Sequence, residues 1–183
     1  GWKIHFEVTS DFGKTWRKIG PLNDGKTLNA IQPSILDHRK GKLQILARSR
    51  DRAVVESWSM DNGETWSPLT KSNLPNNNSG TDAVTLKDGR HVLVYNHVLP
   101  PGDLAKGPRT PLNLSVSKDG KDWSAAVILE DSPISQYSYP SVIQTSDGMI
   151  HVIYTWRRQK IKHAVINPAK LKLSPIKDGK WPE

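Results

Sequence analysis

The sequence predicts an all-β fold, and within that class a β-propeller built from four-stranded blades. Three observations support this prediction: strand-like runs recur, each after a glycine turn; helical periodicity is nearly absent; and a unit of about 50 residues repeats along the chain. Four-stranded repeats of this length are typical of propeller blades. The loops hold most of the 13 glycines and 13 prolines.

Three hairpins repeat one another in order along the chain. They begin at Gln32, Gly80 and Tyr139 with QPSILDHRKG, GTDAVTLKDG and YPSVIQTSDG, and each turn glycine follows nine residues later. The runs after these glycines, such as HVLVYNH, are rich in β-branched and aromatic residues, as strands are. A third strand, an Asp-containing turn and a fourth strand then complete the unit. Only NPAKLKL near the end is predicted to form a short turn of helix.

The Asp-containing turns are a second repeat. They read TSDFGKTW, SWSMDNGETW and SKDGKDW, around Asp11, Asp61 and Asp119. In such a turn the Asp and Ser/Thr side chains can bond backbone N–H groups, the glycine supplies a positive φ, and the tryptophan packs into the blade. The third copy is one residue shorter, which predicts a tighter turn. We therefore interpret these aspartates as structural.

The repeats predict a single partial propeller domain over residues 1–183. Its blades are expected near 1–20 (the last two strands only), 31–75, 79–131 and 138–172, which is about three and a half blades. Closed propellers need at least four blades, and an open arc leaves strand edges exposed. We expect the missing blades to come from the rest of a longer chain or from another copy.

Composition narrows the classes of partner. With 36% apolar and 24% charged residues the chain has an ordinary globular balance, and no apolar run is long enough to span a membrane or to act as a signal peptide. The absence of cysteine excludes disulfides and thiolate metal sites, and no cofactor is predicted. The net charge of +8 suits anionic partners, but the basic residues are scattered and no nucleic-acid motif accompanies them.

Blade geometry brings a set of polar residues to one rim, opposite the Asp-turns. First strands start, second strands end and third strands start at that rim. The set comprises Gln32, Gly80 and Tyr139 at first-strand starts, Arg48, Asn96 and Thr155 at second-strand ends, and Arg109 near a third-strand start. Two arginines and a tyrosine that converge near a propeller axis predict a binding site.

The Asp-turn repeats and two longer segments resemble the sialidase (neuraminidase) superfamily. Its six-bladed propellers bind the carboxylate of sialic acid with three arginines. In RTPLNLSVSKDG, Arg109 lies at the position of the third arginine, and in YPSVIQTSDGMIHVIY, Tyr139 lies at that of the catalytic tyrosine; Arg48 falls at the second arginine. The family's first arginine and its acid/base aspartate come from early blades that this sequence does not contain. The resemblance also suggests a secreted or periplasmic protein.

This resemblance implies an exo-α-sialidase type of glycoside hydrolase that releases a terminal acidic sugar, sialic acid, from glycans. Guanidinium groups hold a carboxylate with paired, charge-assisted hydrogen bonds. Tyrosine is the nucleophile of sialidases, and a neutral phenol avoids repulsion by the carboxylate on the reacting carbon. With an ordinary pKa near 10, that phenol needs a base.

In the family a glutamate 16 residues before the second arginine is the base, and the residue at that position here is Gln32. An amide can orient the tyrosine hydroxyl but cannot take its proton. Either another group, with Asp82 or Glu56 as candidates, acts as the base, or the propeller binds acidic glycans or proteins without catalysis. We include Asp82 and Asn96 with the arginines as substrate-binding candidates.

Structural interpretations of the same residues remain open at this point. Arg48 and Arg109 can be strand-end residues in structural ion pairs, and Tyr139 can be a packed aromatic residue on the rim.

Overall fold

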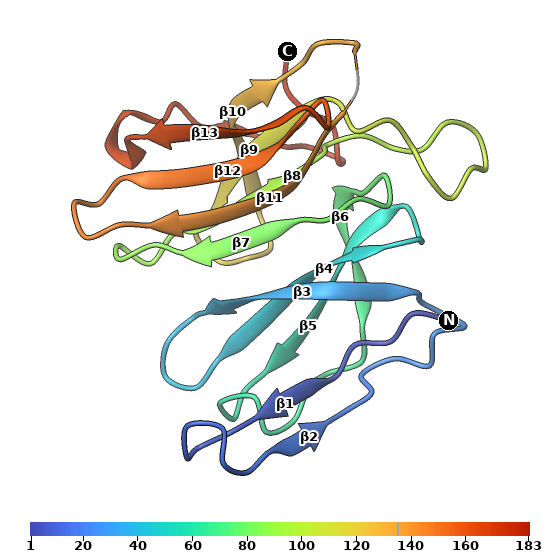
Figure 1. Ribbon diagram of the computed structural model, residues 1–183, viewed down its shortest axis with the longest axis vertical. Coiled ribbons are helices and arrows are strands. Elements are labelled where there is room, and N and C mark those ends of the chain that lie inside the picture. The colour runs from blue at the N-terminus through green and yellow to red at the C-terminus, as the bar shows by residue number, and fades with distance from the viewer. Residues whose placement is uncertain (135) are drawn as a thin grey trace.

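The computed structural model describes residues 1–134 and 136–183. In these residues the chain forms strands and one short 3₁₀-helix, and no α-helix, which confirms the all-β prediction (Figure 1). The helix η1 (Pro168–Lys170) lies within the predicted NPAKLKL segment, and Asn167 caps it through a bond to Ala169 N. The strands are β1 (Phe6–Val8), β2 (Arg17–Ile19), β3 (Ala30–Asp37), β4 (Leu43–Ser49), β5 (Ala53–Ser59), β6 (Thr70–Pro75), β7 (Asp82–Thr85), β8 (His91–Tyr95), β9 (Leu112–Ser117), β10 (Trp123–Glu130), β11 (Tyr137–Gln144), β12 (Ile150–Trp156), β13 (Lys160–Ile166) and β14 (Ser174–Pro175).

The described strands form four antiparallel sheets. Their orders are β1-β2, β3-β4-β5-β6, β14-β10-β9-β8-β7 and β11-β12-β13, so strands that are consecutive in the chain pair with each other. The exception is β14, which returns from the end of the chain to pair with β10. The third sheet therefore has five strands, one more than the sequence repeat predicts, because the segment after residue 172 adds to its edge.

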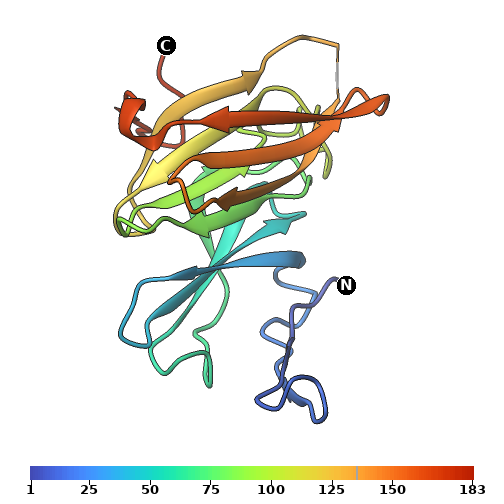
Figure 2. The same cartoon turned by 60° about the vertical axis from the view of Figure 1, so that its left-hand side comes forward.

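The sheets stack face to face in chain order (Figures 1 and 2), and a cluster of buried apolar side chains joins each sheet to the next. The cluster around Ile45 and Val55 joins the β1-β2 sheet to the second sheet. Leu46 and Leu93 belong to the cluster between the second and third sheets, and Val94 and Val152 to the cluster between the third and fourth. Strands β4 and β8 are buried on both faces for this reason, and each has a short apolar run, residues 45–47 in β4 and residues 92–95 in β8.

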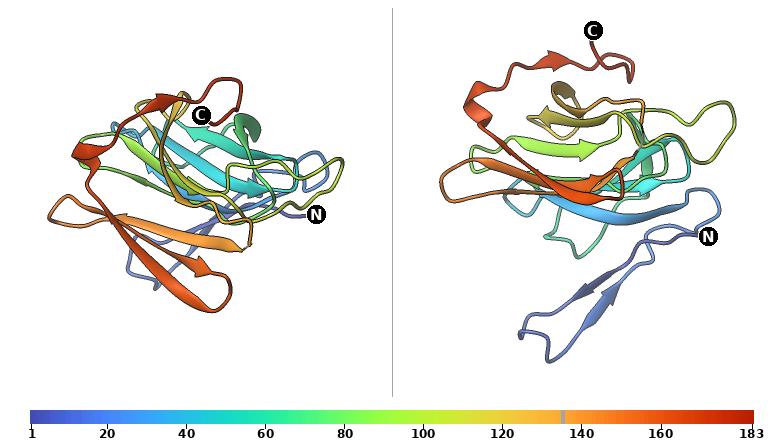
Figure 3. Two further views of the ribbon diagram at one scale, coloured as in Figure 1. Left: turned by 90° about the horizontal axis from the view of Figure 1, so that it is seen from above. Right: turned by 45° about the horizontal axis from the view of Figure 1, so that its top comes forward.

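The far face of the β11-β12-β13 sheet is exposed. Side chains alternate between the two faces of a strand, so one face of this sheet joins the core, and the other presents Ile143, Ile153, Ile161 and Val165, with exposed fractions of 55%, 45%, 74% and 52%. The corresponding side chains of β8, Val92 and Val94, are fully buried against the next sheet. This apolar face lies on the outside of the molecule in Figure 3.

The Asp-turns have the predicted bonds. Asp61 accepts hydrogen bonds from Thr65 N (2.9 Å) and Thr65 Oγ1 (2.6 Å), and Ser59 Oγ accepts one from Gly63 N at 2.8 Å. The same bonds recur around Asp11. They lower the pKa of both aspartates to about 2. These carboxylates therefore stabilise the turns through hydrogen bonds.

The tryptophans of the turns differ in their packing. Trp123 is 2% exposed, Trp66 stacks on Phe6 at 4.9 Å between ring centroids, and Trp16 is 61% exposed. Each indole N–H donates to the glycine carbonyl of its own turn, which orients the ring. Asp119, in the shorter third copy, accepts from the next two backbone amides after its glycine, as a tighter turn requires.

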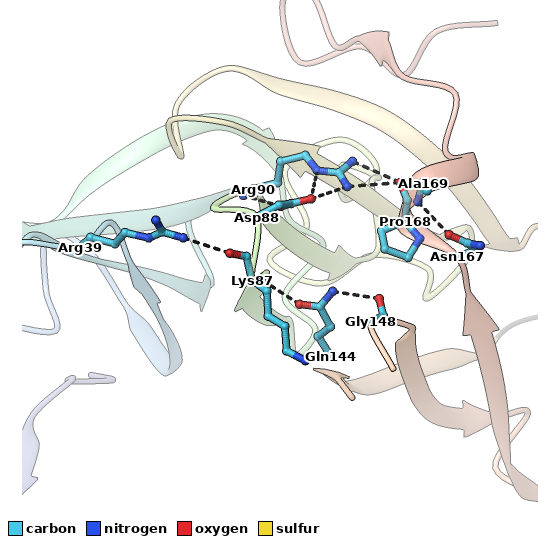
Figure 4. A network of polar contacts seen from close by, with 9 residues as sticks. All are labelled: Arg39, Lys87, Asp88, Arg90, Gln144, Gly148, Asn167, Pro168 and Ala169. Atoms are coloured by element: carbon cyan, nitrogen blue, oxygen red, sulfur yellow. Dashed lines mark hydrogen bonds and ion pairs between the residues drawn. The ribbon is translucent and has the colours of Figure 1, made fainter. Parts of the chain in front are cut away.

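Hairpin turns of consecutive sheets are tied together at the rim that carries the Asp-turns (Figure 4). Arg39 Nη2 donates to Lys87 O at 3.0 Å, and Lys87 N donates to Gln144 Oε1 at 2.8 Å. Arg90 forms an ion pair with Asp88 at 2.7 Å in the same turn. These contacts fix one rim of the stack and leave the opposite rim for the polar residues that the sequence predicts to converge.

Candidate functional site

The site lies where the innermost strands of three sheets start. Strands β3, β7 and β11 lie side by side (Figure 1). Gln32, Gly80 and Tyr139 come together there, as predicted: a Cβ at Gly80 would lie 3.2 Å from the Tyr139 ring and 3.7 Å from Gln32 Oε1. A groove of about 270 Å³ runs between them, and Asp82 forms part of its wall.

Backbone geometry directs two of these side chains into the groove. Gln32 and Tyr139 have φ values of 59° and 50°, in the left-handed region that residues other than glycine rarely adopt. Each lies at an irregularity of its strand pairing, and each precedes a proline, Pro33 or Pro140. Such backbone conformations cost about 1–3 kcal/mol and cluster at functional sites. The repeat therefore carries the same strained feature on two of the three inner strands.

Arg48 enters the site from the end of β4. Its side chain is buried, with 9% of the residue exposed, and its Nε donates to Asn78 Oδ1 at 3.0 Å. Its Nη1 donates to Gln32 Oε1 at 3.3 Å, and its guanidinium carbon lies 4.9 Å from the centre of the Trp2 ring. Two neutral amides and an aromatic face therefore hold this cation.

Arg109 approaches from the segment just before β9. It is also buried, with 8% exposed, and its Nη1 donates to Ser138 Oγ at 3.3 Å. Its guanidinium carbon lies 5.1 Å from the centre of the Tyr139 ring. The backbone bond from Tyr137 N to Arg109 O (2.8 Å) ties this segment to β11. Arg109 therefore reaches the phenol from the neighbouring sheet.

Tyr139 stands between the two arginines. Half of its surface is exposed, and the nearby guanidinium groups, first that of Arg109 and then that of Arg48, lower the pKa of its phenol below the usual 10. A phenol that faces two cations is a better nucleophile than a free one, because positive charge stabilises the phenolate. The same two cations can hold an incoming carboxylate.

Asp82 joins the three inner strands. Its Oδ1 accepts hydrogen bonds from Ser34 Oγ at 2.7 Å and from Ala83 N at 2.9 Å, and its Oδ2 accepts one from Val142 N at 2.8 Å. Both oxygens are engaged, one with β3 and β7 and the other with β11. These contacts assign Asp82 to holding the strands that carry Gln32 and Tyr139.

Two other predicted residues lie away from the groove. Asn96 is fully buried beneath it, and its side chain bonds Ser79 Oγ (2.6 Å) and the carbonyls of Pro111 and Tyr137. Glu56 accepts a bond from Gln44 Nε2 at 2.6 Å, and Gln44 also bonds Gly120 O in the third Asp-turn. Asn96 thus supports the site from below, and Glu56 lies toward the opposite rim, far from the phenol.

Sequence reasoning missed the run of residues that holds Arg48. Asn76, Asn77, Asn78 and Ser79 link β6 to β7, and all four are buried. The run NNNSG between two blades gave no signal of this role, since four consecutive polar residues in a loop are usually exposed. Trp2, which stacks on Arg48, gave no signal of its own.

The described residues contain no cluster of three or more His, Cys, Asp or Glu side chains that could hold a metal ion. In the same part of the chain, no helix has the length and hydrophobicity that crossing a membrane requires.

Comparison with known proteins shows the family and the fold of this chain. Residues 1–152 match the BNR repeat-like domain family, so the chain belongs to that family. Its fold is that of the sialidase β-propellers. A mutant of the NanB sialidase of Streptococcus pneumoniae superposes with a TM-score of 0.73 at 18% identity, over 93% of this chain and 28% of that one.

Two further comparisons find proteins similar to this chain. The intramolecular trans-sialidase of Ruminococcus gnavus superposes with a TM-score of 0.68 at 20% identity, over 93% of this chain and 39% of that one. The anhydrosialidase of Macrobdella decora is 22% identical over 177 residues, which are 87% of this chain and 23% of that protein. The chain therefore spans about a quarter of the length of this curated relative.

Proposed function

We propose that the protein is a glycoside hydrolase of the exo-α-sialidase type, which releases a terminal sialic acid from glycans. The observation that carries this proposal is the placement of two buried arginines, Arg48 and Arg109, beside Tyr139, where they lower the pKa of its phenol. A buried cation is costly unless an anion or strong acceptors compensate it. For Arg48, whose bonds to Asn78 and Gln32 reach neutral amides, a ligand carboxylate would supply that anion.

In this mechanism the two guanidinium groups orient a 2-carboxy sugar over Tyr139. The phenol oxygen forms a bond to the anomeric carbon as the bond to the leaving oxygen breaks, and the proton that the phenol gives up passes to the leaving oxygen. Water then cleaves the tyrosyl intermediate and releases the sugar. Because the nucleophile is not a carboxylate, it does not repel the carboxylate on the reacting carbon.

Gln32 supports a second candidate function, the binding of an acidic glycan or protein without turnover. Its Oε1 accepts a hydrogen bond from Arg48, and its amide cannot take a proton from the phenol. In the hydrolase, the two arginines must therefore favour the phenolate by charge. In the binding protein, Tyr139 only packs against the ligand.

Hydrolysis of a chromogenic α-sialoside by the full-length protein separates the two functions. For the hydrolase we expect Tyr139→Phe to abolish turnover, because the nucleophilic oxygen is removed. Gln32→Glu should preserve or raise the rate, since it adds a base beside the phenol. Tyr154→Phe is the matched control: its hydroxyl bonds Glu130 in β10, so its loss should leave the rate unchanged.

Either of two results would contradict hydrolysis through a tyrosyl intermediate. Turnover that survives Tyr139→Phe undiminished excludes the tyrosyl intermediate. Binding of free sialic acid by a protein that shows no turnover, with or without Gln32→Glu, assigns the binding function instead.

A further inference from the structure

In the part of the chain that the structure describes, no carboxylate forms an ion pair with Arg48. Its bonds run to Asn78 and Gln32, whose side chains are neutral amides, and its guanidinium faces the ring of Trp2. Buried arginines usually have a carboxylate partner. This one is held in place without being neutralised.

Asn78 is built into the fold so that its side chain meets Arg48 Nε. Its φ of 63° lies in the left-handed region, which asparagine and aspartate adopt more readily than other side chains. Its backbone N–H donates to Asn76 Oδ1 at 3.0 Å, and Asn76 in turn bonds Ser49 N, next to Arg48, and Ser79 O. The segment that carries Asn78 is thus fixed at both ends.

We propose that Asn78 is a positioning residue for Arg48: its neutral amide fixes the guanidinium and keeps the full positive charge available to the substrate carboxylate and to the Tyr139 oxygen. An aspartate there would make the same bond to Nε and would be equally compatible with the backbone. It would also pair with the cation and weaken its attraction for a second anion. An asparagine at this position therefore holds Arg48 without reducing its positive charge.

This inference rests on the proposed function, since it assigns Arg48 to a carboxylate. It nevertheless makes a claim about the free protein. The guanidinium groups of Arg109 and Arg48, both close to Tyr139, hold the pKa of its phenol below its usual value. A change at Asn78 that neutralises or releases Arg48 should raise the pKa of Tyr139, with no sugar present.

Three variants of the full-length protein test the proposal. Asn78→Asp keeps the bond to Nε and adds a negative charge. Asn78→Gly removes the acceptor without straining a left-handed backbone. Asn167→Asp makes the same chemical change at the cap of η1, at the rim that carries the Asp-turns, where the aspartate can still accept from Ala169 N.

The first readout is alkaline titration of tyrosinate absorbance, with the Tyr139 contribution taken as the difference from Tyr139→Phe. We expect Asn78→Asp and Asn78→Gly to move this titration to higher pH and Asn167→Asp to leave it in place. The second readout is the calorimetric affinity for N-acetylneuraminic acid. We expect Asn78→Asp to weaken it at least tenfold and Asn167→Asp to change it less than twofold.

An Asn78→Asp protein with an unchanged Tyr139 titration and unchanged affinity would overturn the proposal, because a purely geometric role tolerates an isosteric acceptor. An Asn78→Gly protein unchanged in both readouts would also overturn it, because Arg48 would then need no support from residue 78. Arg48→Ala distinguishes failure of the proposed function from failure of the role of Asn78. If Arg48→Ala leaves the affinity for the sugar unchanged, Arg48 does not bind the carboxylate and the proposed site is wrong.

Discussion

Replacement of Gly80 by alanine should slow the proposed hydrolysis without destabilising the protein. A Cβ at this position would lie 3.2 Å from Cδ1 and 3.6 Å from Cε1 of Tyr139, and 3.7 Å from Gln32 Oε1. Ordinary contacts of a Cβ begin near 3.4 Å. The ring must therefore move by a few tenths of an ångström, away from a position that the two arginines define.

The expected magnitudes follow from this geometry. A misplacement of about 1 Å can cost about 100-fold in rate, so a few tenths of an ångström should cost roughly 3- to 10-fold in kcat/KM. Gly80 is not among the residues with a positive φ. Alanine is compatible with its backbone and should stabilise the fold by about 0.4–1 kcal/mol through the unfolded state, which offsets the strain of moving the ring.

The assay compares kcat/KM on a chromogenic α-sialoside with the midpoint of thermal unfolding. Gly148→Ala is the contrasting control: it has open space around its Cβ but a φ of +86°, so it should lose stability and keep its rate per folded molecule. If Gly80→Ala keeps the full rate while it remains folded, then the position of the Tyr139 ring over Gly80 does not set the rate, and the assigned geometry is wrong.

Three further perturbations have defined outcomes. Asp82→Asn should lower the free energy of unfolding by about 1.5–3 kcal/mol in denaturant titration, because the bond to Val142 N loses its charge; no loss would show that Asp82 does not join the inner strands. Asp61→Asn should destabilise the protein at pH 7, and the difference should vanish as pH falls from about 4 to about 2, because the folded protein keeps this pKa depressed; a pH-independent difference contradicts this. Burial lowers the pKa of His91 to about 4, so stability should fall between pH 6.5 and about 4, where the unfolded chain binds the proton first. His91→Gln should flatten that part of the stability curve, and an unchanged slope in this variant would exclude His91 as its cause.

Much of the architecture could be predicted because each blade carries its own local signals. The spacing from Gln32 to Gly41 recurs in the other two hairpins, and side-chain alternation then fixes which residues enter the core. The convergence of Gln32, Tyr139 and Arg48 followed from strand direction alone, because first-strand starts and second-strand ends share a rim. Strand β14 could not be predicted, because its two residues carry no periodicity and pair with β10 only through tertiary contact.

The details of the site depend on features that a single sequence hides. The positive φ of Tyr139 accompanies the irregular pairing of β11 with β12, and the residue type at this position does not predict it. Asn96 is predicted as a substrate-binding residue from its position at the end of a strand, but its side chain is fully buried and bonds Ser79 and the carbonyls of Pro111 and Tyr137. The contact of Asn78 with Arg48 joins residues 30 positions apart across two loops.

The central claim, that Arg48 and Arg109 bind a ligand carboxylate, can be tested by changing the ligand alone. Calorimetry on the full-length protein should compare N-acetylneuraminic acid with its 2-carboxamide, which keeps the shape of the sugar and removes the charge. Loss of hydrogen bonds to a charged group costs about 1.5–3 kcal/mol, so the carboxamide should bind roughly 10- to 150-fold more weakly. Equal affinity for the acid and the amide would show that the two arginines do not bind the carboxylate.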